Sequence, residues 1–225
     1  MNIRGLSIRT KEDMVKLVDR LGFLPFFPNS VPGFSVEEMA DPSIWFHGVE
    51  GPWEWKGPVI RATGCVYGKF FEKKAGFISR EWFPDFANFR RDGYDFDARY
   101  DDGLASHRDK ELFELLDENA PIHTKLLRDK GDYRKGGKKG FETLITRLQF
   151  QCYAVVNDFL YLKDKNGKPY GWGVAEYSTP EKVLGADFTD AVYVRKPEES
   201  YQRVFEYLNR LLPDAGEAAI KKLLK

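Results

Sequence analysis

The pattern that most constrains the fold lies in residues 105–177, where three amphipathic helical segments precede two β-rich segments. Residues 108–119 repeat apolar side chains at the spacing of a helix. Pro121 is suited to open a second, shorter helix, because its missing N–H costs little in a first turn. The third helix is predicted from a stripe of four apolar residues, Phe141, Leu144, Ile145 and Leu148.

Two β-rich segments, 153–162 and 172–177, follow the third helix. Between them lies Asn166-Gly167, the dipeptide most typical of a tight hairpin turn. Three helices followed by a two-stranded hairpin form the arrangement of a winged helix, which is a variant of the helix-turn-helix. The sequence therefore predicts an α+β protein in which a winged-helix unit joins an aromatic-rich N-terminal lobe and a helical C-terminal tail.

The acidic stretch of residues 92–102, which contains Gly93 and is followed by Gly103, is the best candidate for a boundary between lobes. We expect an aromatic-rich lobe at 1–100, the winged-helix unit at 101–178 and a tail packed on the body at 179–225. A chain of 225 residues is also short enough for these parts to form one compact domain.

The N-terminal lobe begins with a predicted helix over 11–21, opened by a capping box of Thr10 and Asp13. Residues 23–57 contain five prolines and are interpreted as an aromatic-rich irregular segment. One short helix is expected within this segment, near residues 35–39.

The rest of the lobe is expected to be a hairpin followed by a helix. The hairpin joins 65–71 to 76–79 through a turn at 73–76, and Ser79 is placed to cap a helix over 80–91. The tail is expected to contain a short helix after Pro180, a strand, a helix over 198–212 and a last short helix after Pro213. The strand is predicted at residues 191–194.

Composition restricts the class of function. The formal net charge is zero, which gives no global support for binding nucleic acid or an anionic membrane. Charge is uneven along the chain: residues 92–118 hold ten acids and three bases, whereas residues 123–140 hold seven bases and two acids. The two segments are interpreted either as solvated faces that partly neutralise each other or as the basis of a basic binding surface.

The two cysteines, Cys65 and Cys152, lie far apart and are expected to be free thiols in the core. They share no short spacing with the three histidines, so we expect no metal site and no cofactor. No signal sequence and no long apolar run is present, which predicts a cytoplasmic protein with no membrane partner. The sequence leaves the oligomeric state open.

The start of the third helix is the first candidate for contact with DNA. Lys135, Lys138 and Lys139 precede or open this helix, and the neighbouring glycines would let backbone N–H groups approach a phosphate. Arg147 and Gln151 would extend the same surface. The alternative is a solvated loop on a winged helix that serves structure or protein interaction.

The second candidate is an aromatic site formed by Trp45, Trp53 and Trp55. A carboxylate between two indoles, such as Glu54, could act as an acid or base, and a flipped base could stack between the rings. Alternation along an extended segment would place both indoles on one side and Glu54 on the other. We therefore favour two core anchors and a surface carboxylate over a catalytic site.

Two segments resemble a known family: Pro52-Trp53-Glu54-Trp55-Lys56, and the run of residues from Tyr67 to Pro84. Both are similar to the AlkZ-related bacterial proteins, and the resemblance covers most of the chain. The group takes its name from the AlkZ and YcaQ DNA glycosylases, winged-helix proteins that remove alkylated bases or unhook crosslinks. The resemblance implies a winged-helix fold and a role in DNA repair.

Those glycosylases place a Gln-x-Asp or Gln-x-Gln pair just after an early helix. The corresponding stretch here is Gly22-Phe23-Leu24-Pro25-Phe26-Phe27, which has no glutamine and no carboxylate. The leading hypothesis is therefore binding of double-stranded DNA, and whether the protein is an enzyme is left open. The alternatives are a glycosylase that uses Glu54, or a small-ligand or protein-interaction module centred on the aromatic residues.

Overall fold

The computed structural model shows one six-stranded antiparallel sheet with the strand order β1-β3-β2-β5-β6-β4. It describes every residue except 1–2, 4, 46–49, 164 and 168. The protein is an α+β protein, as predicted. The strands are β1 Phe23–Pro25, β2 Val66–Phe71, β3 Lys74–Ile78, β4 Ile122–His123, β5 Val155–Lys163 and β6 Pro169–Ser178.

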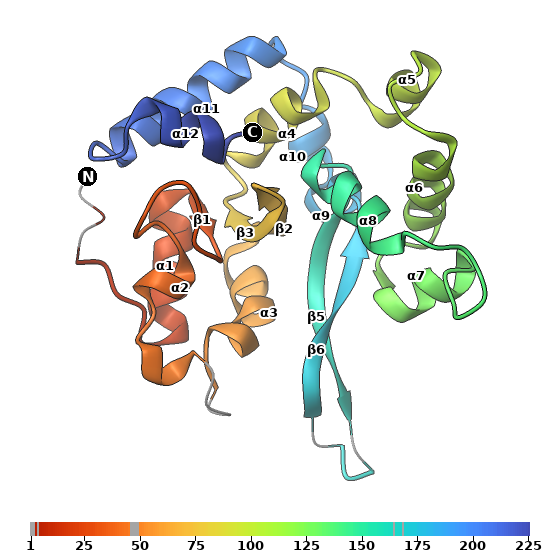
Figure 1. The fold of residues 1–225 in the computed structure, drawn as a ribbon, viewed down its shortest axis with the longest axis horizontal. Helices are drawn as coiled ribbons and strands as arrows, with labels where there is room; N and C mark the ends of the chain where they lie inside the picture. The colour runs from red at the N-terminus through yellow and green to blue at the C-terminus, as the bar shows by residue number, and fades with distance from the viewer. Residues whose placement is uncertain (1–2, 4, 46–49, 164, 168) are drawn as a thin grey trace.

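Helices surround this sheet on several sides (Figure 1). Helices α1 to α3 lie beside β1, whereas α11 and α12 lie over α4, and α6 and α7 lie on the far side of the β5–β6 hairpin. The N-terminal helices are α1 Lys11–Leu21, α2 Val36–Met39, α3 Pro52–Thr63, α4 Phe83–Arg91 and α5 Phe96–Asp101. The others are α6 His107–Asn119, α7 Thr124–Lys130, α8 Phe141–Phe150, α9 Pro180–Leu184, α10 Ala186–Thr189, α11 Pro197–Leu211 and α12 Glu217–Leu223.

Helix α1 confirms the prediction for its segment. The Thr10 hydroxyl accepts from the Asp13 N–H at 3.2 Å, and the Asp13 carboxylate accepts from the Thr10 N–H at 3.0 Å. The helix ends at Gly22, whose φ of 69° is left-handed. A Cβ at this glycine would lie 2.6 Å from the Trp82 ring, so glycine also allows the close approach of α4. The short helix near residues 35–39 is confirmed as α2, capped by Ser35.

The interpretation of residues 23–57 as irregular was wrong at both ends. Its first three residues form β1, which pairs with β3, and its last residues begin α3. Helix α3 has Gly51 at its N-cap and Pro52 in its first turn, where proline is favoured. Pro58 lies inside the same helix. Counting prolines as helix breakers therefore hid a helix of 12 residues.

The hairpin of the N-terminal lobe is confirmed, but its turn is earlier than predicted. Glu72 and Lys73 have φ values of 50° and 60°, so these two residues make the turn and Lys74 already belongs to β3. Helix α4 begins at Phe83 rather than at residue 80, because the Ser79 carbonyl first accepts from Trp82 and Phe83 in a separate turn.

Residues 105–177 contain the three predicted helices and the hairpin, with one correction. Pro121 does not open the second helix. It precedes β4, whose Ile122 pairs with Tyr177 of β6, and α7 follows. Strand β5 also pairs with β2, at Val156 and Tyr67. The sheet thus continues through both the lobe at 1–100 and the unit at 101–178, while the winged-helix assignment and the division into domains stay predictions.

The tail packs through α11 onto α4. The Asp85 carboxylate of α4, which is buried, accepts from the Ser200 hydroxyl at 2.9 Å and from Arg203 Nε at 2.9 Å. The predicted strand at 191–194 was wrong: these residues form turns, and the Val192 N–H donates to the Phe188 carbonyl. Two valines gave the segment a strand-like composition without a neighbouring strand to pair with.

Aromatic rings fill the core between the sheet and α4. Fully buried rings include Phe23, Phe70, Phe71 and Phe86. The prediction of free buried cysteines is confirmed, and burial raises the pKa of both Cys65 and Cys152 to about 12. Within the described part of the chain, the helices lack the combination of length and apolar composition needed to cross a bilayer.

Candidate functional site

Exposed bases gather on α7 and on the loop that leads to α8. We call this group the basic surface, and it comprises Lys125, Lys130, Arg134, Lys135, Lys138 and Lys139. Tight turns hold the loop, because Gly136 and Gly140 have left-handed φ values of 94° and 90°. Gly140 is the N-cap of α8 and supplies no capping side chain. The first N–H groups of α8 therefore follow Lys138 and Lys139 directly in the chain and have no capping side chain from Gly140.

Acidic neighbours neutralise part of the basic surface. Lys138 Nζ lies 3.0 Å from Glu111 Oε2 of α6, and Arg134 Nε lies 2.8 Å from Asp129 Oδ1. Within the described residues, Lys135 and Lys139 have no carboxylate at ion-pair distance. Both interpretations of the uneven charge thus apply in part, because two of the six bases are paired and the other four, Lys125, Lys130, Lys135 and Lys139, have no ion pair within the described residues.

Arg147 and Gln151 are further along α8 than the lysines of the loop. Arg147 donates to Asp109 Oδ1 from Nε at 2.8 Å and from Nη2 at 2.5 Å. Asp109 is 4% exposed and also belongs to the capping box of α6, so Arg147 joins two helices. Gln151 is half-buried at the C-cap of α8. The predicted DNA contacts therefore form two groups. The lysines of the loop before α8 are exposed, whereas Arg147 and Gln151 contact or cap other parts of the protein.

The aromatic residues form a packed cluster rather than an exposed face. The Trp53 ring lies 5.7 Å from that of Trp45 and 5.4 Å from that of Phe26, measured between centroids. Trp55 is buried at 6% exposure, but residues two apart in a helix point in different directions. The alternation argued for an extended segment does not apply in α3. We call Phe26, Trp45, Trp53 and Phe159 the aromatic cluster.

Glu54 has a structural hydrogen bond. As the third residue of α3, it accepts from the Gly51 N–H through Oε2 at 3.0 Å. This contact satisfies a backbone donor that the helix itself leaves without a partner. Its side chain is half-buried, and a catalytic role for it stays a prediction. The segment that aligns with the glycosylase pair, including Pro25, is an apolar strand at the edge of the sheet.

Lys56 is the group that the sequence did not single out. Its Nζ lies 4.3 Å from the ring centroid of Phe159 and 4.6 Å from that of Trp53. The residue is 9% exposed. Burial lowers the pKa of Lys56 from 10.5 to about 8, although nearby Glu54 acts in the opposite direction. The spacing of Trp53 and Lys56 would have indicated a shared helix face once α3 was recognised.

Replacing Lys56 by methionine is expected to stabilise the protein at neutral pH. The folded-state pKa lies below the unfolded value, so the unfolded chain binds more protons between pH 8 and 10.5 and the wild-type protein gains stability as pH rises through this range. We expect the free energy of unfolding of the wild type to rise by about 2 kcal/mol, relative to the variant, between about pH 7.5 and 9.5. Urea unfolding of both proteins at several pH values measures this difference, and parallel pH profiles would contradict it.

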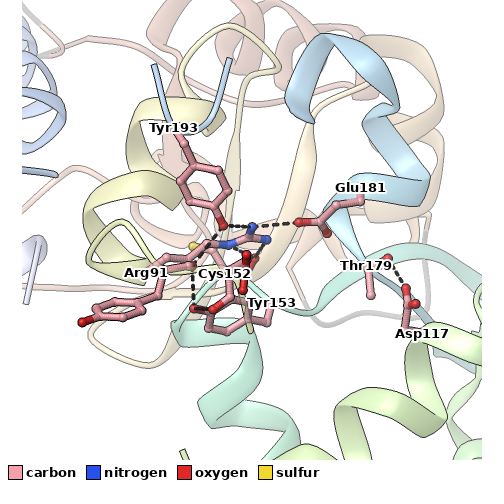
Figure 2. A network of polar contacts seen from close by, with 9 residues as sticks. Arg91, Asp117, Cys152, Tyr153, Thr179, Glu181 and Tyr193 are labelled. Atoms are coloured by element: carbon pink, nitrogen blue, oxygen red, sulfur yellow. Dashed lines mark hydrogen bonds and ion pairs between the residues drawn. The ribbon is translucent and has the colours of Figure 1, made fainter. Parts of the chain in front are cut away.

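A second buried cation, Arg91, holds together segments that are distant in sequence (Figure 2). It donates to Glu181 Oε1 at 2.7 Å, to the Tyr193 hydroxyl at 2.8 Å and to the Cys152 carbonyl at 2.8 Å. Burial acts to lower the pKa of Arg91, but Glu181 and Tyr193 more than offset it and the pKa is raised. All three guanidinium nitrogens of Arg91 donate hydrogen bonds, which indicates that this residue stabilises the fold.

Fold and surface together define an α+β protein with a single antiparallel sheet, an exposed basic surface and a separate aromatic cluster. The chain belongs to the AlkZ-related family, because the family model described as "AlkZ related" matches residues 8–225. This confirms the resemblance found in the sequence and supports a relation to DNA glycosylase-like proteins. No curated protein and no solved structure gives a significant match to the chain.

Proposed function

We propose that the protein binds double-stranded DNA through the basic surface, with Lys135 and Lys139 as its main phosphate contacts. The observation that carries the proposal is that these two lysines are exposed, have no carboxylate partner within the described residues and belong to the loop that leads into α8, with Lys139 directly before its N-cap Gly140. Exposed ammonium groups and a helix N-terminus are the groups that proteins commonly offer to a DNA phosphate. Membership of the AlkZ-related family supports nucleic acid as the partner.

The proposal covers binding and does not extend to base removal. The stretch that the sequence resemblance sets against the polar pair of the glycosylases contains the buried, apolar strand β1. The aromatic cluster also lies apart from the basic surface: Figure 1 shows α3 on one side of the β5–β6 hairpin and α7 on the other. Support from the family is therefore stronger for binding than for catalysis.

Replacing Lys135 and Lys139 together by alanine is expected to weaken duplex binding about tenfold or more at low salt. Each lysine that contacts a phosphate contributes roughly one unit to the slope of log affinity against log salt concentration, so the slope should fall by about two. Fluorescence anisotropy with a labelled duplex, measured at several salt concentrations, gives both quantities.

The matched control replaces Lys16 of α1 and Lys221 of α12 by alanine, which removes the same charge from exposed positions away from the basic surface. This control should retain the affinity and the salt slope of the wild type. Equal losses in the two double variants would mean that net charge, rather than the basic surface, governs binding. A wild-type protein without salt-sensitive binding would overturn the proposal itself.

A further inference from the structure

The amine of Lys56 ends among aromatic rings instead of reaching solvent. Its Nζ lies above three of them, 4.3 Å from the centroid of Phe159, 4.6 Å from that of Trp53 and 5.7 Å from that of Phe26. Lysine is almost never buried to this extent unless an acid pairs with it. The amine lies at the contact between α3, which carries Lys56, and strand β5, which carries Phe159.

Helix α3 and strand β5 approach each other closely at Gly57. A Cβ at this position would lie 2.6 Å from Asp158 Oδ1, so a larger residue would displace the Asp158 carboxylate. Arg61 of α3 then binds Asp158 of β5, with Nη1 at 2.5 Å from Oδ1 and 2.6 Å from Oδ2. This ion pair joins α3 to β5, the two elements that carry Lys56 and Phe159.

No acid forms an ion pair with the Lys56 amine within the described residues, although the charge of Glu54 acts on it from a distance. Within the described residues, its Nζ has no ion pair and no hydrogen-bond acceptor. The two nearby acids are engaged elsewhere, since Glu54 caps α3 and Asp158 binds Arg61. An apolar side chain of the same length would fill this space without the cost of burying a charge. Packing alone therefore does not account for a lysine here.

We propose that Lys56 is an amine nucleophile that binds an aldehyde as an imine within the aromatic cluster. The lone pair of the unprotonated Nζ forms a bond to the carbonyl carbon as the carbon–oxygen π bond breaks, and one proton passes from that nitrogen to the oxygen to give a neutral carbinolamine. The carbinolamine hydroxyl then takes up one proton from water and leaves as water, while the nitrogen lone pair forms the carbon–nitrogen double bond of a protonated imine. Hydrolysis reverses the sequence, so no oxidant or reductant is needed.

Two properties of the site favour this step. With a pKa of about 8, roughly one Lys56 amine in ten is unprotonated at pH 7, compared with fewer than about one in a thousand for an ordinary lysine. The faces of Trp53 and Phe159 that now lie near the ammonium would equally stabilise the positive charge of the imine.

The aldehyde has two chemically equivalent sources: the ring-opened sugar of an abasic nucleotide in DNA, or a small free aldehyde. The first source rests on the proposed DNA binding and also requires the bound duplex to reach the α3 side of the β5–β6 hairpin, whereas the second requires neither. The test therefore has two arms, in which the full-length protein is incubated with a duplex that contains one abasic site or with glyceraldehyde. Sodium cyanoborohydride is present in both arms to reduce the imine to a stable amine, and peptide mass mapping locates the adduct.

We expect the adduct to map to Lys56 in at least one arm, to form at least tenfold faster there than at exposed lysines such as Lys16, and to follow a pH profile with a midpoint near 8. Lys56→Arg and Lys56→Met should abolish it. Lys69→Arg is the matched control, because Lys69 is also partly buried but donates to the Thr146 hydroxyl at 2.9 Å. It should leave the reaction at Lys56 unchanged.

The outcomes separate the two proposals. An adduct at Lys56 with glyceraldehyde in a protein that does not bind duplex DNA would support the nucleophile and overturn the proposed function. Salt-sensitive DNA binding without an adduct at Lys56 in either arm would support the proposed function and refute the nucleophile. Adducts spread evenly over exposed lysines, or an unchanged trapping rate in a folded Lys56→Arg variant, would also refute the nucleophile. Circular dichroism melting establishes that each variant is folded.

Discussion

Replacing Arg91 by alanine is expected to lower the free energy of unfolding by about 3–5 kcal/mol. The side chain is 1% exposed, and its removal leaves Glu181, the Tyr193 hydroxyl and the Cys152 carbonyl without their donor. It also removes a planar group that packs near Tyr153 and Phe188. Unfolding in urea, followed by tryptophan fluorescence, gives the free-energy difference between variant and wild type.

Arg80→Ala is the matched control for this experiment. Arg80 also pairs with an acid, Asp187, at 2.8 Å, but both side chains are largely exposed to solvent. Exposed ion pairs stabilise proteins by about 1 kcal/mol or less, so the control should lose far less stability than Arg91→Ala. Similar losses in the two variants would show that burial of the Arg91 network contributes nothing beyond an ordinary surface pair.

Replacing Phe86 by alanine is expected to have a comparable effect, a loss of about 3–5 kcal/mol, through a cavity instead of a broken polar network. The Phe86 ring is fully buried and lies 5.9 Å from the ring of Phe70 and 6.0 Å from that of Phe71. It therefore joins α4 to the central strand β2. Chemical denaturation measures the loss.

Phe89→Ala, in the same helix, is the comparison for the cavity. Phe89 is only partly buried, although its ring lies 4.9 Å from that of Phe86. Its removal opens a space that solvent can reach, so the expected loss is about half that of Phe86→Ala or less. A larger loss for Phe89 than for Phe86 would mean that the contact between α4 and α11, rather than the sheet-facing core, limits stability.

Segments with complete local signals were predicted well. Helix α1 has its predicted bounds because Thr10, Asp13 and Gly22 mark both of its ends in the sequence. The stripe of α8 was also correct, since four apolar residues at helical spacing face the core. These features depend on neighbours within a few positions, which a sequence displays directly.

Segments that depend on distant partners were predicted poorly. Strand β4 has two residues and exists only because β6 pairs with it, so Pro121 was taken instead as the start of a helix. Residues 191–194 have a strand-like composition, but none of the strands among the described residues pairs with them. Helix α3 was missed for a different reason, because Pro52 and Pro58 outweighed the apolar residues between and after them.

In the candidate site, too, the sequence predicted the local features, whereas the contacts between distant segments became known only from the structure. Sequence alone located the basic loop before α8, but it grouped Lys138 and Arg147 with Lys135 and Lys139 as equivalent contacts. Packing of α6 against α8 brings Glu111 to Lys138 and Asp109 to Arg147, which leaves two of these four bases unpaired within the described residues. The availability of a charge for DNA is thus a property of the folded surface.

The sequence by itself determined the amphipathic helices, the two hairpins, the local charges and the family, because each is written in short patterns of adjacent residues or in the run of the chain as a whole. The tertiary structure decided which charges are neutralised and which are buried. Lys56 acquires its low pKa from Phe159 and other residues far from it in the sequence, and Arg91 finds its partners in three separate segments. Burial and pairing arise only when distant segments pack, so no pattern of adjacent residues could have revealed them.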